Sequence, residues 1–134
     1  TLPPSSSWRD YSNTLQEFIA IYKQANLPLW IDEYGFRLSN ESESIQYTEA
    51  DRVAYLKGFY HALSCENSIT AAYFIWTAGN DRHVSFPDRD TDRTPFGLFS
   101  GYENNNPITT PAWDEVASFN TTPSYCEQFV ETTQ

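Results

Sequence analysis

The acidic residue Glu33 ends a short apolar run and is the clearest candidate for chemistry in the chain. The run LPLWIDEYG covers residues 27–35, with a glycine two positions after Glu33. A carboxylate buried at a strand end is costly unless it is paired or used. Alternation along a strand would place Glu33 on the side of Ile31 and opposite Tyr34. Since only one of the two adjacent acids can then point inward, we select Glu33 over Asp32.

A strand-end carboxylate can serve several reactions as acid, base or nucleophile. One of these reactions, retaining glycoside hydrolysis, requires two carboxyl groups about 5–5.5 Å apart. One carboxylate attacks the anomeric carbon, and the other donates a proton to the leaving oxygen and later activates water. The nucleophile must stay ionised while the acid keeps its proton near neutral pH. Glu33 suits the first role. The alternative is that Glu33 is a strand-end carboxylate in a structural hydrogen-bond network.

The elements that would position Glu33 follow from the spacing of apolar residues. Helical spacing predicts helices over Trp8–Ala25 and Thr48–Cys65, and a third, short helix that starts at Thr110-Pro111. Near-continuous apolar runs predict buried strands over Leu27–Tyr34 and Ile69–Trp76.

Side chains at the expected helix ends support these boundaries. Ser7 can cap the first helix, and Thr48 with Asp51 forms an imperfect capping box at the second. The polar stretch 77–106 is expected to be a long connection. The residues expected to face inward from the third helix are Trp113, Val116 and Ala117.

Strands that alternate with helices are typical of an α/β fold with a parallel sheet and right-handed crossovers. Two parallel strands alone would leave both edges open. The order of elements therefore predicts that residues 1–134 are one part of a larger sheet structure.

Three segments resemble clan A glycoside hydrolases, as found among cellulases, mannanases and β-glycosidases. LPLWIDEYG resembles the seventh-strand motif of that clan, and its glutamate, aromatic residue and glycine match Glu33, Tyr34 and Gly35. AAYFIWTAGND resembles the eighth strand, whose tryptophan corresponds to Trp76 and forms the floor of the sugar site. RTPFGLF, residues 93–99, resembles the segment that closes the barrel.

The resemblance implies a partial TIM (β/α)8 barrel, with residues 1–134 as the C-terminal portion of the catalytic domain and 121–134 as an extended tail. It implies hydrolysis of O-glycosidic bonds in a β-linked oligo- or polysaccharide, with Glu33 as nucleophile. Trp76, Tyr34 and Asp81 would bind substrate. Ordinary core packing for Trp76 and a solvated loop position for Asp81 are the alternatives.

The sequence departs from the clan pattern at the acid/base residue. In the clan this glutamate follows an asparagine upstream of the nucleophile, and the 32 residues before Glu33 contain no Asn-Glu pair. Asn40-Glu41 lies downstream in a polar stretch, so the role is not transferred to Glu41. We therefore expect the chain to need the rest of the barrel or another chain to complete the fold.

The net charge of −10 argues against nucleic acid and membrane partners, because an acidic surface repels phosphate backbones and anionic lipids. A neutral carbohydrate fits the charge and the 16% aromatic content. We expect no cofactor and no metal. The DRDTD run 88–92 departs from the EF-hand pattern at Arg93 and Phe99, which leaves an irregular calcium site as the alternative.

The two cysteines, Cys65 and Cys126, show no zinc or redox spacing. The sequence leaves two alternatives for this pair, a disulfide bond and two unrelated buried thiols. Asn-Glu-Ser at residue 40 and Asn-Thr-Thr at residue 120 match the glycosylation acceptor pattern, so we expect a secreted or extracellular protein. His61 is expected to be structural.

Two other functions remain open from the sequence. A non-catalytic carbohydrate-binding or assembly fragment would account for the missing acid/base residue. A different α/β barrel enzyme, such as an aldolase-like one, is the third hypothesis, because a fold alone does not determine the chemistry.

Overall fold

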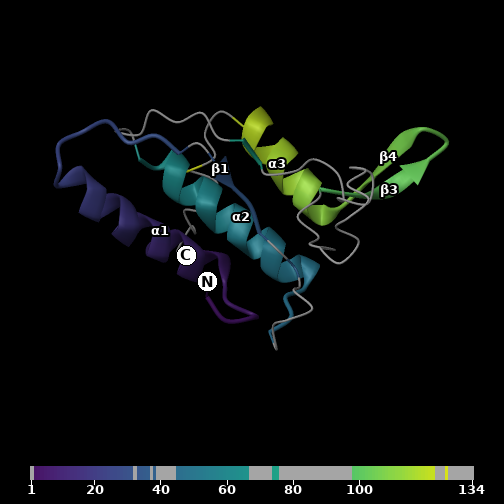
Figure 1. The fold of residues 1–134 in the computed structure, drawn as a ribbon, viewed down its shortest axis with the longest axis horizontal. Coiled ribbons are helices and arrows are strands. Elements are labelled where there is room, and N and C mark those ends of the chain that lie inside the picture. Colours follow the sequence, from purple (N-terminus) through teal and green to yellow (C-terminus); the bar gives the residue numbers. More distant parts are fainter. Residues whose placement is uncertain are drawn as a thin grey trace, which may run out of the picture.

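In this computed structural model, the described residues are 2–31, 33–36, 38, 45–66, 74–75, 98–122 and 126. For residues 33, 74–75 and 99–102 the description covers the backbone only. Three helices dominate this part of the chain, and α2 lies between α1 and α3 (Figure 1). None of the helices described is long and apolar enough to cross a membrane.

Helix α1 (Trp8–Lys23) is capped by Ser7, as the sequence predicts, and Asp10 makes the cap reciprocal. The Ser7 hydroxyl accepts a hydrogen bond from the Asp10 N–H at 3.3 Å, and the Asp10 carboxylate accepts one from the Ser7 N–H at 2.8 Å. These bonds satisfy two backbone donors that have no partner within the helix. Asn26, with φ of 51°, takes up the left-handed conformation just after the helix.

Helix α2 (Glu49–Ser64) repeats this arrangement with Thr48 as its N-cap. The Thr48 hydroxyl accepts from the Asp51 N–H at 3.3 Å, while the Asp51 carboxylate accepts from the Thr48 N–H at 2.7 Å. Asp51 also accepts from the Ser5 N–H, so the chain before α1 is tied to the start of α2. The predicted second helix and its capping box are confirmed.

A glycine lets α1 and α2 approach closely. A Cβ atom added to Gly58 of α2 would meet the Trp8 carbonyl oxygen, and it would lie 2.7 Å from the Tyr11 Cβ and 2.8 Å from the Ser12 nitrogen. Side chains essentially never make contacts this short. The helices therefore pack backbone to backbone at this point, a spacing that any larger residue would prevent.

Helix α3 (Pro111–Thr121) starts with proline in its first turn. Its Ala112 N–H donates to the Glu49 carboxylate at 3.1 Å, which joins the N-terminal ends of α2 and α3. Ala112 is fully buried, whereas Trp113 is 37% exposed. The expectation that Trp113 faces inward is wrong, because the close contact with α2 is made by the small residue before it.

The buried core lies between the helices. Its members come mainly from α2, with contributions from α1, α3 and the residue before β3: Ile19, Leu56, Phe59, Tyr60, Leu63, Leu98 and Ala112. Leu56 and Tyr60 have no exposed surface. The Tyr60 ring stacks on Phe119 of α3, with centroids 4.2 Å apart and planes within 5°. Helix-to-helix contacts thus bury the apolar residues.

Strand β1 (Glu33–Tyr34) pairs in parallel with β2 (Phe74–Ile75), with Glu33 opposite Phe74 and Tyr34 opposite Ile75. Each of these strands has two residues, against 16, 16 and 11 residues in the helices. The fold class predicted from the sequence, a partial (β/α)8 barrel built on parallel strands, is therefore wrong. The described structure is mostly helical, and its core is formed by helices packed on one another.

The predicted buried strand over residues 27–34 is also wrong for most of its length. Leu27 and Trp30 are 72% and 62% exposed, and β1 covers only the last two residues of the run. Tyr34 packs against the same core as Leu29 and Ile31, although alternation predicted opposite sides. A continuous apolar run indicates burial on both faces only where neighbours cover it, and among the residues that the structure describes the strand pairing of this run with β2 is limited to Glu33 and Tyr34.

A hairpin of β3 (Phe99–Glu103) and β4 (Asn106–Thr109) begins within the stretch 77–106, which the sequence predicts to be a connection, and ends just after it. Asn104 and Asn105 between the strands have φ values of 50° and 65°. Positive φ at both central residues is the geometry of the tight turns that suit antiparallel strands. The hairpin extends away from the N-terminal end of α3, the helix that follows β4 (Figure 1).

Candidate functional site

The structure describes only some of the site residues that the sequence predicts. The backbone of Glu33 lies in β1, next to the first residue of β2. Tyr34 is partly buried against the helical core. Trp76 and Asp81, like His83 and the DRDTD run 88–92, lie outside the described residues. Of the four proposed site residues, the structure therefore positions the β1 pair only.

Tyr34 connects β1 to α2. Its ring stacks on Phe59 with centroids 4.7 Å apart and planes 17° from parallel. Its phenol oxygen lies 2.6 Å from that of Tyr60, close enough for a hydrogen bond in which either group can be the donor. These contacts fix the position of the residue that follows Glu33 in the chain.

An aromatic layer continues from Tyr34 along α2 and α1. Tyr55 stacks on Phe59 at 5.8 Å and meets Tyr11 edge to face at 5.7 Å. Burial, followed by the nearby phenol of Tyr34, raises the pKa of Tyr55 to about 12. Burial also raises the pKa of Tyr11 to about 12. Both phenols stay protonated at neutral pH, so this layer supplies packing and hydrogen bonding rather than a charged base.

A second group of polar side chains surrounds His61 in the last turn of α2. The Nδ1 atom of His61 lies 2.8 Å from the Ser12 hydroxyl, which also accepts a hydrogen bond from Gln16 at 3.0 Å. The Trp8 ring meets the imidazole edge to face at 5.0 Å. This contact links α1 to α2, in keeping with the structural role that the sequence predicts for His61.

The surroundings of His61 disfavour its charged form. Burial, and to a smaller extent the Arg9 cation, lowers the pKa of His61 below its usual value. A hydroxyl next to a neutral imidazole could in principle act as a nucleophile. Ser12, however, is 2% exposed, so its oxygen cannot reach a substrate in this structure.

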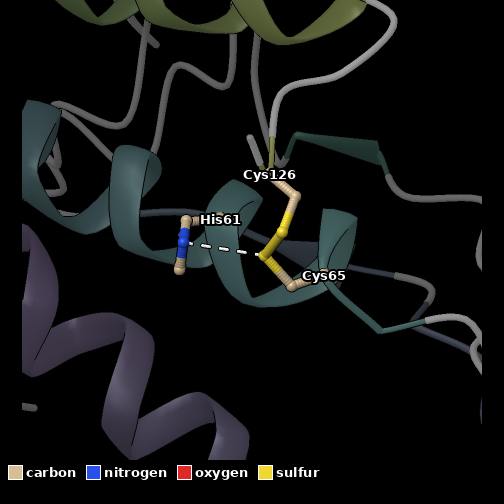
Figure 2. Close-up of side chains that lie close together, drawn as sticks. All are labelled: His61, Cys65 and Cys126. Atoms are coloured by element: carbon tan, nitrogen blue, oxygen red, sulfur yellow. Dashed lines mark hydrogen bonds between the residues drawn. A yellow bond between two sulfur atoms is a disulfide. The ribbon is translucent and has the colours of Figure 1, made fainter. Parts of the chain in front are cut away.

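Cys65 and Cys126 form a disulfide, which decides between the two alternatives left open by the sequence. The Cys65 sulfur lies 3.6 Å from Nε2 of His61, and Figure 2 shows the imidazole beside the disulfide. Potential ligand atoms of His61, Cys65 and Cys126 lie within 4.8 Å of one another. Sequence reasoning missed this cluster, although the four-residue spacing of His61 and Cys65 on one helix face was a usable signal.

Comparisons with known proteins add no identification: no protein family model, curated protein or solved structure matches this chain.

Proposed function

We propose that this chain supplies the nucleophilic carboxylate, Glu33, of a retaining glycoside hydrolase that acts on a β-linked oligo- or polysaccharide. The observation that carries the proposal is the parallel register of β1 and β2. Parallel strands direct their C-terminal ends to the same edge. Glu33 and Tyr34 thus stand beside Phe74 and Ile75, and the next residue in the sequence after β2 is Trp76.

The chemistry of the surroundings is consistent with this role. A glycosidase nucleophile must be held in place and must stay ionised. The contacts of Tyr34 with Phe59 and Tyr60 anchor the backbone of β1 on α2. The net charge of −10 suits a neutral sugar substrate better than an anionic one.

A secreted location belongs to the same proposal. The Cys65–Cys126 disulfide supports it, since disulfides form and persist mainly in oxidising compartments outside the cytosol.

The test is covalent trapping. The full-length protein is incubated with 2-deoxy-2-fluoro glycosyl fluorides of β-glucose and β-mannose, and labelled peptides are mapped by mass spectrometry. We expect one label per chain, on Glu33, and no label on Glu33→Gln. Asp32→Asn is the matched control, because it removes the neighbouring carboxylate, and it should keep the label. A label on any other residue, or full labelling of Glu33→Gln, would rule out the proposed nucleophile.

A second candidate function is carbohydrate binding without turnover. It is favoured by exposed aromatic rings on and after α1: Phe18, Tyr22 and Trp30 are 51%, 47% and 62% exposed. Such rings can stack on the apolar faces of sugars. Trp30→Ala and Tyr22→Ala should then weaken retention in polysaccharide-containing gels, whereas Leu27→Ala, which removes exposed apolar surface without a ring, should not. Binding with no hydrolysis and no covalent label would favour this function over the first.

A further inference from the structure

Three side chains around the end of α2 have the identities of a metal site. His61 lies in the last turn, Cys65 is the C-cap of the helix, and Cys126 reaches the same point from the C-terminal segment (Figure 2). A sulfur in a disulfide bond cannot act as a thiolate ligand, so the oxidised cluster is closed to metal. Reduction would release two thiols beside an imidazole.

The separation of the imidazole and the first sulfur fits a zinc ion. Zn–N and Zn–S bonds of about 2.0–2.1 and 2.3 Å, set at the tetrahedral angle, place nitrogen and sulfur about 3.6 Å apart. Nε2 of His61 and Sγ of Cys65 are 3.6 Å apart in the structure. One helix thus holds the two atoms at the separation that a shared zinc ion requires.

The third ligand needs only a small movement. Two thiolates on one zinc lie about 3.8 Å apart in the same tetrahedral geometry. The Cα atoms of Cys65 and Cys126 are 5.1 Å apart, and all three potential ligand atoms lie within 4.8 Å of one another. Opening the S–S bond and turning the Cys126 side chain would therefore complete the set.

The orientation of the imidazole is already controlled from α1. The Ser12 hydroxyl lies 2.8 Å from Nδ1 of His61. When Nδ1–H donates to Ser12, Nε2 is the ring nitrogen that carries the lone pair. Metal-binding histidines are commonly held in this way by a partner on the other ring nitrogen.

We propose that reduction of the Cys65–Cys126 disulfide creates a site for one Zn²⁺ ion, held by His61, Cys65 and Cys126 with water in the fourth position. A dithiol reductant supplies two electrons and two protons to the S–S bond and is itself oxidised to a disulfide. Zinc then replaces the two thiol protons, which pass to solvent. The site is independent of Glu33 and of glycoside hydrolysis.

The test compares the oxidised and reduced chain. Zinc binding is measured without oxygen, by competition with a chromophoric chelator, before and after reduction with a phosphine. We expect one zinc per reduced chain and an affinity at least about 100-fold higher than that of the oxidised chain, since only the reduced form offers thiolates. Equal affinities would overturn the proposal.

Variants separate this site from binding by thiols alone. His61→Asn should weaken zinc binding to the reduced chain by at least about 10-fold. Ser12→Ala should weaken it by about 10-fold, which is the lower end of the range for losing a residue that supports a metal ligand. His83→Asn, at the only other histidine, is the matched control and should leave the affinity unchanged. Unchanged affinity in His61→Asn would show that the imidazole is not a ligand.

A spectroscopic measurement on the unsubstituted chain avoids dependence on the folding of variants. On addition of Zn²⁺ to the reduced, ¹⁵N-labelled protein, the Nε2 resonance of His61 should move to a metal-bound shift, and the ring nitrogens of His83 should not. A reduced chain that binds zinc while the His61 resonances stay in place would contradict the proposed ligand set.

Discussion

The phenol oxygens of Tyr34 and Tyr60 lie 2.6 Å apart, and this contact attaches a two-residue strand to the middle of a buried helix. Tyr60 has no exposed surface and also stacks on Phe119, so β1, α2 and α3 meet at one ring. The position of the chain next to Glu33 therefore depends on the helical core.

A double-mutant cycle should reveal this coupling. Tyr34→Phe and Tyr60→Phe each remove one hydroxyl of the pair, and each should lower the free energy of unfolding by about 1 kcal/mol. The double variant should lose less than the sum, by about 0.5–1.5 kcal/mol, because one hydrogen bond cannot be lost twice. Urea unfolding measures all three. Tyr22→Phe, on an exposed ring, is the control. If the losses in the two single variants add up to the loss in the double variant, the hydrogen bond between Tyr34 and Tyr60 is contradicted.

Gly58→Ala should destabilise the protein although alanine is the better helix former. The added methyl group would meet backbone atoms of α1 at Trp8 and Ser12, which cannot turn aside as a side chain can. We expect a loss of about 1–3 kcal/mol in the free energy of unfolding, as for overpacked cores. Thermal unfolding followed by circular dichroism provides the measurement.

The matched control for Gly58 is Asn13→Ala, on the exposed surface of α1. Helix propensity alone predicts a gain of a few tenths of a kcal/mol there. If Gly58→Ala were also stabilising, α1 and α2 could not pack as closely as the structure has them.

Asp51 should make stability depend on acid pH. Hydrogen bonds from the Thr48 hydroxyl, then from the backbone of Thr48 and Ser5, lower the pKa of Asp51 below its usual value. A group whose pKa is lowered on folding stabilises the protein above its unfolded pKa, about 3.9 for aspartate. That contribution is lost as the pH falls from about 4 through the lower pKa of the folded state.

Unfolding measured between pH 7 and pH 2 tests this dependence. Asp51→Asn should lower stability at pH 7 and flatten the acid side of the profile, because the titrating group is gone. Asp114→Asn removes one charge from the exposed first turn of α3 and is the matched control. Profiles of the same steepness in Asp51→Asn and in the unsubstituted chain would contradict the assignment.

Reduction of the disulfide should lower the free energy of unfolding by about 2–4 kcal/mol, because Cys65 and Cys126 are 61 residues apart in the chain. The bond removes conformational freedom mainly from the unfolded state. Urea titrations with and without a phosphine, in the presence of a chelator that removes zinc, give the difference. The Cys65→Ser/Cys126→Ser double variant should match the reduced chain and should not respond to the phosphine.

Local signals in the sequence predicted α1 and α2 well. The caps at Ser7 and Thr48 depend on side chains three residues apart, and the sequence displays that spacing directly. The tight turn at Asn104-Asn105 was missed although it too is local, because asparagine tolerates positive φ and the pair was assigned to a loop.

The remaining errors arose where structure depends on distant partners. The run 27–34 is apolar enough for a buried strand, but only Glu33 and Tyr34 pair with β2, and Trp30 is exposed. The relation of His61 to Ser12 depends on how closely α1 approaches α2, and that approach depends on Gly58. The spacing of residues within one helix carries no information about such contacts.

The bond between Cys65 and Cys126 also makes the intervening chain a closed covalent ring that contains the β3–β4 hairpin and α3. A protease that cuts this ring once leaves two polypeptide chains that the disulfide still joins, so no fragment is released. The cleaved molecule would keep its mass, apart from one added water, and would separate into two pieces only after reduction. Intactness on a non-reducing gel therefore does not demonstrate an unbroken backbone for this protein.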